Sequence, residues 1–266
     1  MVSRNLEEAR EAYKEKNIEA TIEAHKKTSL KAQENHNQEQ GQYIKSLIYG
    51  GLDGIITTFA VVAGVAGAAL SPSVVLILGF ANLVGDGLSM AIGDYLSTKA
   101  ETEYKEAERK REAWEVEHYP EGEKQELMEL YIEKGIAEED AKIVTEIFSK
   151  NKEAWIDIMM VEELGIIEEN ESPVKNALVT FFSFGIFGLI PLIAYVFSKF
   201  IPSINSEGNM FFLSCILTAL TLFILGALKV KITGKNWIRS GLEMLIVGGL
   251  AAGAAYLIGA LFSGLA

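Results

Sequence analysis

The sequence predicts an all-α, polytopic membrane protein with five transmembrane helices and a cytosolic three-helix insertion between helices 2 and 3. Two observations predict this fold. Five stretches reach the roughly 20 apolar residues that a spanning helix needs. Negative charge is concentrated in one polar segment, residues 97–172, which holds 23 acidic and 10 basic residues. The expected spans are residues 47–70, 73–96, 176–198, 208–228 and 240–262.

The predicted spans divide the chain into four parts: residues 1–46, 47–96, 97–172 and 173–266. In the first part, apolar residues recur at helical intervals between about residues 6 and 33, which predicts an amphipathic helix that lies on the membrane or packs on the insertion. We expect His25 and His36 in this part to be solvated rather than to bind a ligand. The segment is too polar for a cleaved signal peptide.

The second span continues into the acidic insertion without a helix-breaking residue. No proline occurs from Ser73 to His118, and the first break is the segment from Tyr119 to Gly122. About 46 residues at roughly 1.5 Å each make a helix of about 70 Å, more than twice the thickness of a bilayer's hydrocarbon core. A membrane helix is therefore expected to be continuous with a soluble, glutamate-rich one.

Basic residues predict the orientation in the membrane. Lys229, Lys231, Lys235 and Arg239 crowd the link between spans four and five, whereas the link at 71–73 carries no charge. By the positive-inside rule, the four-to-five link, the N-terminus and the insertion face the cytosol, and the C-terminus lies on the far side.

Composition and motifs exclude several functions. A net charge of −12 disfavours nucleic acid as a partner. Cys215 is the single cysteine, so an intrachain disulfide and a thiolate metal cluster are excluded, and we expect it to pack in the membrane core. The sequence has no nucleophile elbow, phosphate-binding glycine loop or zinc-binding His/Cys cluster. We therefore expect neither an enzyme nor a prosthetic group.

Asp53 lies in the first predicted span, one or two turns from its cytosolic end. An ionised carboxylate is costly there, so we expect it to be paired, protonated or bound to a cation. Small residues beside it, Gly50 and Gly54, and later Gly64 and Gly67, form faces that allow close helix approach. Dimerisation through these faces and ordinary packing within the chain are both open.

Span two carries a stripe of candidate ion-path residues. Asp86, Met90 and Asp94 are spaced four apart and share one helix face. Oxygen and thioether ligands together suit Fe²⁺ better than Mg²⁺ or Ca²⁺. In span five, Glu243 is either a second protonatable group on the path or a residue at the headgroup level that faces water. Pro191 predicts a kink in span three.

The insertion carries a candidate divalent-metal site. Two pairs of glutamates flank the turn that begins at Tyr119, and a helical hairpin would bring them together. A third helix over about residues 138–164 ends in a Met-Met-Val-Glu-Glu sequence, which adds soft and hard ligands. The alternative is a solvated acidic surface. The candidate ligands are Glu112, Glu115, Glu123, Glu126, Met159, Met160 and Glu163.

A di-iron oxidase site is a weaker alternative. Glu115 and His118 match the Glu-x-x-His unit of di-iron helical bundles, but that chemistry needs a second such unit. Neither His25 nor His36 has a glutamate three residues before it. We therefore do not expect iron oxidation of the ferritin type.

Three motifs resemble the vacuolar iron transporter family. They are Tyr49-Gly-Gly-Leu-Asp-Gly-Ile-Ile-Thr-Thr-Phe-Ala-Val-Val-Ala-Gly in span one, Gly87-Leu-Ser-Met-Ala-Ile-Gly-Asp-Tyr-Leu-Ser in span two, and Met159-Met-Val-Glu-Glu-Leu-Gly at the end of the insertion. The resemblance covers about residues 46–262. It implies a five-helix protein whose metal-binding domain lies in the cytosol between spans two and three.

The resemblance also implies a function. Family members export Fe²⁺, and often Mn²⁺, from the cytosol into a vacuole or out of the cell in exchange for protons, and they act as homodimers with the path between subunits. Asp53 and Met90 would be the intramembrane ligands, and the seven candidate residues of the insertion would be the ligands there.

We therefore expect a proton antiporter in which Asp53, helped by Asp86 or Glu243, binds either a proton or a metal ion. Two alternatives remain: a membrane-tethered metal buffer or sensor without transport, and a channel without proton coupling. Oxygen and thioether sites discriminate weakly among Fe²⁺, Mn²⁺, Co²⁺ and Zn²⁺.

Overall fold

The computed structural model describes residues 12–13, 15–20, 22, 38–167, 172–198, 200–201, 206–233 and 236–265. The chain forms two compact units, Met1–Gln42 and Tyr43–Ala266. In the first unit, a turn at Lys16 with φ of 51° separates the helical residues 12, 13 and 15 from residues 18–20, and Asn17 accepts a hydrogen bond from the Ala20 amide. One uninterrupted helix over residues 6–33 was therefore a wrong prediction. His25 and His36 lie outside the described residues.

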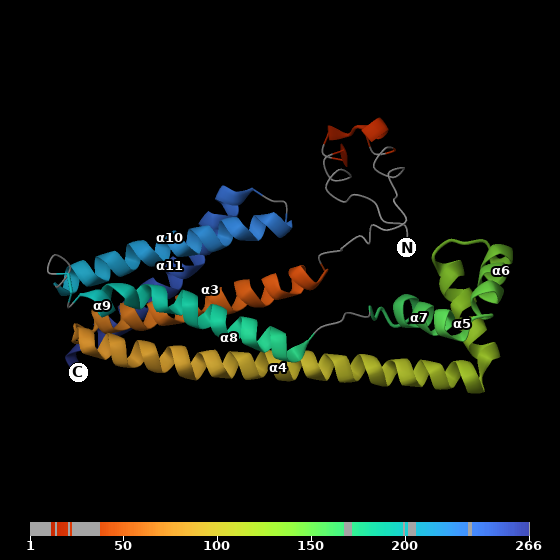
Figure 1. The fold of residues 1–266 in the computed structure, drawn as a ribbon, viewed down its shortest axis with the longest axis horizontal. Coiled ribbons are helices and arrows are strands. Elements are labelled where there is room, and N and C mark those ends of the chain that lie inside the picture. The colour runs from red at the N-terminus through yellow and green to blue at the C-terminus, as the bar shows by residue number, and fades with distance from the viewer. Residues whose placement is uncertain are drawn as a thin grey trace. The chain divides into compact units, whose positions relative to one another are not determined.

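The second unit contains five helices that are long and apolar enough to cross a membrane, as predicted. They are α3 (Gln38–Gly67), which enters this unit at Tyr43, α4 (Pro72–His118), α8 (Pro173–Leu189) with its continuation, α10 (Glu207–Thr233) and α11 (Trp237–Phe262) (Figure 1). A short 3₁₀ turn, η3 (Ser263–Leu265), follows α11. The described residues form no strand.

The predicted kink at Pro191 is a short 3₁₀ helix, η1 (Ile190–Leu192), between α8 and α9 (Ile193–Phe197). Proline lacks an amide hydrogen, so one helical hydrogen bond is missing at this point. The hydroxyl of Ser214 on α10 donates to the Pro191 carbonyl at 2.7 Å. The neighbouring span thus holds the interrupted one in place.

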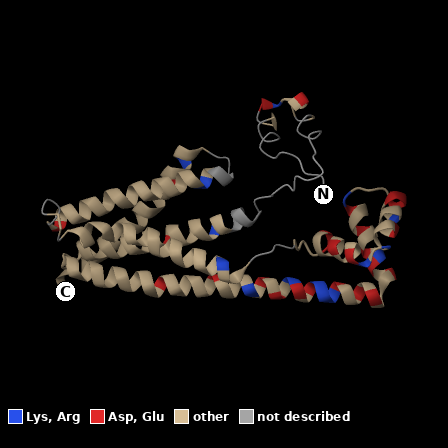
Figure 2. Cartoon of the chain, in the orientation of Figure 1, with Lys and Arg blue, Asp and Glu red and all other residues tan. Residues whose placement is uncertain are grey.

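The predicted continuity of the second span with the insertion is confirmed, because α4 runs for 47 residues. The apolar part of α4 ends near residue 96, and the charged part that follows belongs to the insertion together with α5 (Pro120–Glu133), α6 (Glu138–Phe148) and α7 (Lys152–Glu162). Figure 2 shows the charged residues concentrated on the C-terminal half of α4 and on these three helices, while the spans are nearly free of charge.

One helix over residues 138–164 was a wrong prediction, since α6 and α7 are separate. Asn151 caps α7, with its side-chain oxygen accepting from the Ala154 amide at 3.2 Å. An asparagine at this position satisfies an otherwise unpaired amide and favours a new helix start. The break allows α7 to fold back onto α4.

The small-residue faces of α3 pack within the chain. A side chain at Gly54 would collide with the Phe184 carbonyl on α8, and one at Gly67 would collide with the Tyr256 carbonyl on α11. Glycine is needed where two helix backbones approach this closely. Packing within the chain, one of the two alternatives that the sequence left open, therefore accounts for these faces.

Apolar side chains form a core in each part of the second unit. In the bundle, Phe184 and Leu192 are fully buried between the spans. In the insertion, Leu127 and Trp155 join α5 and α7 to the end of α4. This second core positions the acidic side chains of Glu112, Glu123 and Glu163.

Candidate metal site and membrane path

Three carboxylates from three segments meet in the insertion. Glu112 on α4, Glu123 on α5 and Glu163 directly after α7 place their oxygens within 4.8 Å of one another. Glu112 and Glu123 are 1% and 5% exposed, and each has one buried oxygen with no hydrogen-bond partner. A buried carboxylate oxygen without a partner is unfavourable unless the group is protonated or neutralised by a cation. The arrangement is thus suited to bind a cation.

The pKa values of these carboxyls reflect this environment. Burial, with the nearby charge of Glu163, raises the pKa of Glu112 to about 7. Burial, with the nearby charge of Glu112, raises the pKa of Glu123 to about 7. Glu163 also has a raised pKa, from burial and the charge of Glu126. A divalent cation in the cluster would favour the ionised forms.

The other predicted ligands surround this cluster. Glu115 is half-buried and Glu126 is exposed, and both act electrostatically on Glu123. Met159 and Met160 are fully buried in the apolar core of the insertion beside the cluster helices. The structure thus brings three of the seven predicted ligands into direct proximity, with two acids near them and two methionines in the adjoining core.

His118 has no part in the carboxylate cluster. Its ring stacks on Trp114 with centroids 4.4 Å apart, and its Nδ1 lies 2.8 Å from the Trp114 carbonyl. Both side chains are exposed. This placement agrees with the expectation that the Glu115-x-x-His118 unit does not form a di-iron site.

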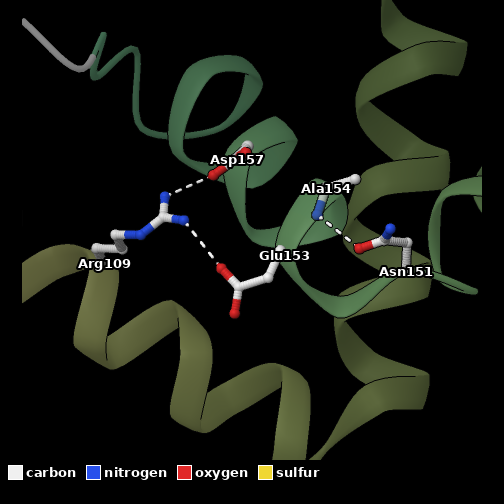
Figure 3. Close-up of polar contacts among 5 residues, drawn as sticks. All are labelled: Arg109, Asn151, Glu153, Ala154 and Asp157. Carbon is white, nitrogen blue, oxygen red and sulfur yellow. Dashed lines mark hydrogen bonds and ion pairs between the residues drawn. The ribbon is translucent and has the colours of Figure 1, made fainter.

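Two arginines that the sequence analysis did not single out contact the acidic residues. Arg111 lies 3.4 Å from Glu112 and 4.0 Å from Glu115. Arg109 joins α4 to α7 through Glu153 at 3.2 Å and Asp157 at 2.6 Å, and Figure 3 shows its guanidinium group directed at both carboxylates. In the sequence, Arg111 lies one residue before the candidate ligand Glu112 and four before the candidate ligand Glu115, and this spacing could have pointed to it.

A polar contact connects the first two spans near Asp53. Asn82 on α4 donates to the hydroxyls of Thr57 at 3.2 Å and Thr58 at 3.3 Å on α3. Thr57 in turn donates to the Asp53 carbonyl. Asp86, one turn from Asn82, is close enough for its charge to act on Asp53. The two predicted path carboxylates therefore lie near this polar contact, Asp53 on α3 and the exposed Asp86 on α4, and we call these residues the membrane strip.

Met90 and Asp94, the next positions of the predicted stripe, have different surroundings. Met90 is half-buried against the apolar core of the bundle. Asp94 accepts hydrogen bonds from Thr180 on α8 at 2.5 Å and from Ser46 on α3 at 3.3 Å. Asp94 thereby joins three helices where α4 leaves the bundle. A role in the ion path remains a prediction for both residues.

Glu243 lies in an exposed position on α11. Its side chain is 66% exposed and lies 3.9 Å from the Lys229 ammonium on α10. This is the environment expected for the water-facing alternative.

Comparison with known proteins identifies the family. The family model described as "VIT family" matches residues 44–260. The chain belongs to the VIT family. The matched region includes the insertion and the five spans except the first residue of the first span and the last two of the fifth.

Several VIT relatives are similar over nearly their full length. A protein of Toxoplasma gondii named "Vacuolar iron transporter" is 42% identical, over 97% of this chain and 88% of the relative. A protein of Plasmodium falciparum with the same name is 39% identical, over 97% of each chain. "Vacuolar iron transporter 1" of Arabidopsis thaliana is 34% identical, over 89% of this chain and 92% of the relative.

These matches confirm the family to which the sequence motifs pointed. They also agree with the prediction of a multi-pass integral membrane protein that is a transporter rather than an enzyme, because the relatives carry transporter names.

Proposed function

We propose that this chain transports Fe²⁺ out of the cytosol in exchange for protons, and that its insertion binds the ion before it enters the membrane. One observation carries the proposal. The single helix α4 bears Glu112 of the carboxylate cluster, in which Glu112 and Glu123 are buried and Glu163 is exposed, and, farther toward its N-terminus, Asp86 of the membrane strip. The names of the relatives support iron as the substrate.

The insertion is suited to collect the ion. Glu112 and Glu123 contribute buried carboxylate oxygens that a metal would neutralise, and many further acids of the insertion raise the local concentration of cations. Carboxylates with adjacent methionines suit borderline divalent ions, so we propose that Mn²⁺, Co²⁺ and Zn²⁺ also bind.

Proton exchange would occur at Asp53. A carboxylate within a span binds either a proton or a cation, since both neutralise its charge. Protonation from the acidic far side would release the metal, and a pH gradient would then drive accumulation. The basic link between α10 and α11 supports a topology in which the insertion faces the cytosol and the C-terminus lies on the far side. A vacuolar-type or plasma membrane fits this orientation.

A second copy of the chain would complete the path. Asp86 is exposed on α4, although it lies in a span where an exposed carboxylate is costly. Gly85, next to Asp86, and Gly93, two helical turns further along α4, are exposed, and a side chain added at either would meet no described atom within 4 Å. Small residues permit close helix contact. We therefore propose a homodimer in which this face of α4 meets its counterpart.

Flux measurements in liposomes test this function. Fe²⁺ would be added anaerobically to liposomes that contain the protein, a metal-sensitive dye and an acidic interior. Antiport predicts metal entry that slows when the pH gradient is removed, together with a rise in internal pH. Metal entry independent of the gradient would indicate a channel. Binding without entry would indicate a buffer or sensor.

A further inference from the structure

We infer that Arg111 is the resident counter-cation of the insertion's carboxylate cluster and that it competes with the incoming metal ion. Arg111 would thereby set the metal concentration at which the insertion fills. The inference rests on the proposed function, because it assigns a regulatory residue to the proposed metal site.

The contacts of Arg111 place its positive charge at the edge of the cluster. Its Nη2 atom lies 3.4 Å from Glu112 Oε1, and its Nε atom lies 4.0 Å from Glu115 Oε2. The other oxygen of Glu112, Oε2, is buried and has no hydrogen-bond partner. The charge of Arg111 also acts on Glu163, the cluster member that follows α7. Arg111 thus partly neutralises two acids of the cluster.

Arg111 has a second partner outside the cluster. Its Nη2 atom lies 2.8 Å from Glu108, one turn earlier on α4 and not among the predicted ligands. The Arg111 side chain is 49% exposed, so solvent reaches it and little packing holds it. When a metal ion occupies the carboxylates, the guanidinium group can stay with Glu108. Its displacement from Glu112 and Glu115 is therefore inexpensive.

The sign of the effect distinguishes this role from a structural one. A divalent ion in the cluster repels a positive charge beside it, and removal of that charge strengthens metal binding. A unit charge about 6 Å from a divalent ion at the dielectric constant of water corresponds to about a ten-fold change in affinity. If Arg111 instead held the carboxylates in their binding geometry, its removal would weaken binding.

Anaerobic titration of the purified full-length chain with Fe²⁺ tests the inference. Arg111→Gln should bind Fe²⁺ about ten-fold more tightly than the parent chain, and Arg111→Lys should remain close to the parent because the charge is kept. The matched control is Lys110→Gln, which removes the same charge one residue away. Lys110 is 81% exposed and pairs with Glu106, so its removal should leave the affinity unchanged.

The variant Glu123→Gln separates failure of the inference from failure of the proposed function. In that background, the cluster is disrupted and Arg111→Gln should have no further effect. If the parent and Glu123→Gln chains bind Fe²⁺ alike, the proposed metal site is wrong and the inference is overturned with it. If the parent binds more tightly than Glu123→Gln, while Arg111→Gln equals or falls below the parent, the inference alone is overturned.

Discussion

At the scale of single residues, Glu112 and Glu123 are the buried acids of the proposed metal site. Each is almost fully buried with one oxygen unsatisfied, a state that natural proteins retain where a proton or a cation completes it. The sequence predicted both residues from their spacing around the turn at Tyr119. It did not distinguish them from Glu115 and Glu126, because burial depends on how α5 docks against α4.

Their raised pKa values predict a pH dependence for metal binding. At pH values below about 7, Glu112 and Glu123 hold protons that a metal ion must displace. Affinity of the insertion for Fe²⁺ should rise roughly ten-fold per pH unit for each proton released as the pH increases toward 7. Titrations between pH 5.5 and 7.5 measure how steeply the Fe²⁺ affinity rises with pH. In Glu123→Gln, metal binding should release about one proton fewer, so this rise should be less steep. A flat profile would contradict the assignment.

The same protons affect stability in the opposite direction. The unfolded chain releases them near the ordinary glutamate pKa of 4.5, whereas the native chain keeps them to about 7. The native state therefore binds more protons over this interval, and the metal-free insertion should lose stability as the pH rises through it. Bound metal should abolish the loss. Hydrogen exchange of α5 at several pH values, with and without metal, measures this effect.

At the scale of secondary-structure elements, the packing of one helix against another determines where the candidate site residues lie. The continuity of α4 was predictable, because no proline interrupts the chain from Ser73 to His118. The break before α7 was missed, because apolar residues continue at helical spacing across Asn151. Partners of the glycine faces could not be predicted, because periodicity identifies a helix face and not the helix that covers it.

The contact between α3 and α8 should depend on Gly54. A methyl group there would collide with the backbone oxygen of Phe184, so the two helices would have to separate. Gly54→Ala should lower stability by about 1–3 kcal/mol, measured by thermal unfolding in detergent. The matched control Gly185→Ala on α8 meets no described atom within 4 Å and should be tolerated. A fully stable Gly54→Ala chain would show that the helices do not approach this closely.

The docking of α7 on α4 should depend on Arg109. Loss of its ion pairs with Glu153 and Asp157 in Arg109→Gln should cost about 1 kcal/mol, since each is a surface pair. Amide exchange in α7 should then accelerate about five-fold, while α6 should stay unchanged. Lys99→Gln, which removes a pair within α4 alone, is the control. Equal exchange rates in all three chains would mean that Arg109 does not hold α7.

At the scale of the whole molecule, one chain leaves part of the proposed path incomplete. The membrane strip includes Asp53 and Asp86, and Asp86 is exposed on α4. The five spans and the acidic insertion were predictable from hydropathy and charge. The exposed face of α4 was not predicted, because helical spacing does not show which small-residue faces are covered within the chain, and the small-residue faces that the sequence pointed to lie on α3 and pack inside it.

A cross-linking experiment tests the proposed dimer. Ser89 lies on the exposed face of α4 between Gly85 and Gly93. In a Cys215→Ser background, Ser89→Cys should form a disulfide-linked dimer under mild oxidation if the two α4 helices meet within about 7 Å. Ala254→Cys on the exposed face of α11 is the control and should stay monomeric on a non-reducing gel. Equal cross-linking of both variants would argue against a specific α4 interface.

The central claim is that Asp53 exchanges protons for metal ions. The most direct test records metal and pH together inside liposomes that contain the parent, Asp53→Asn or Glu243→Gln chain. Asp53→Asn should abolish Fe²⁺ entry and proton exit together, while Glu243→Gln, which loses an exposed ion pair with Lys229, should keep both. Coupled fluxes that continue undiminished in Asp53→Asn would contradict the account.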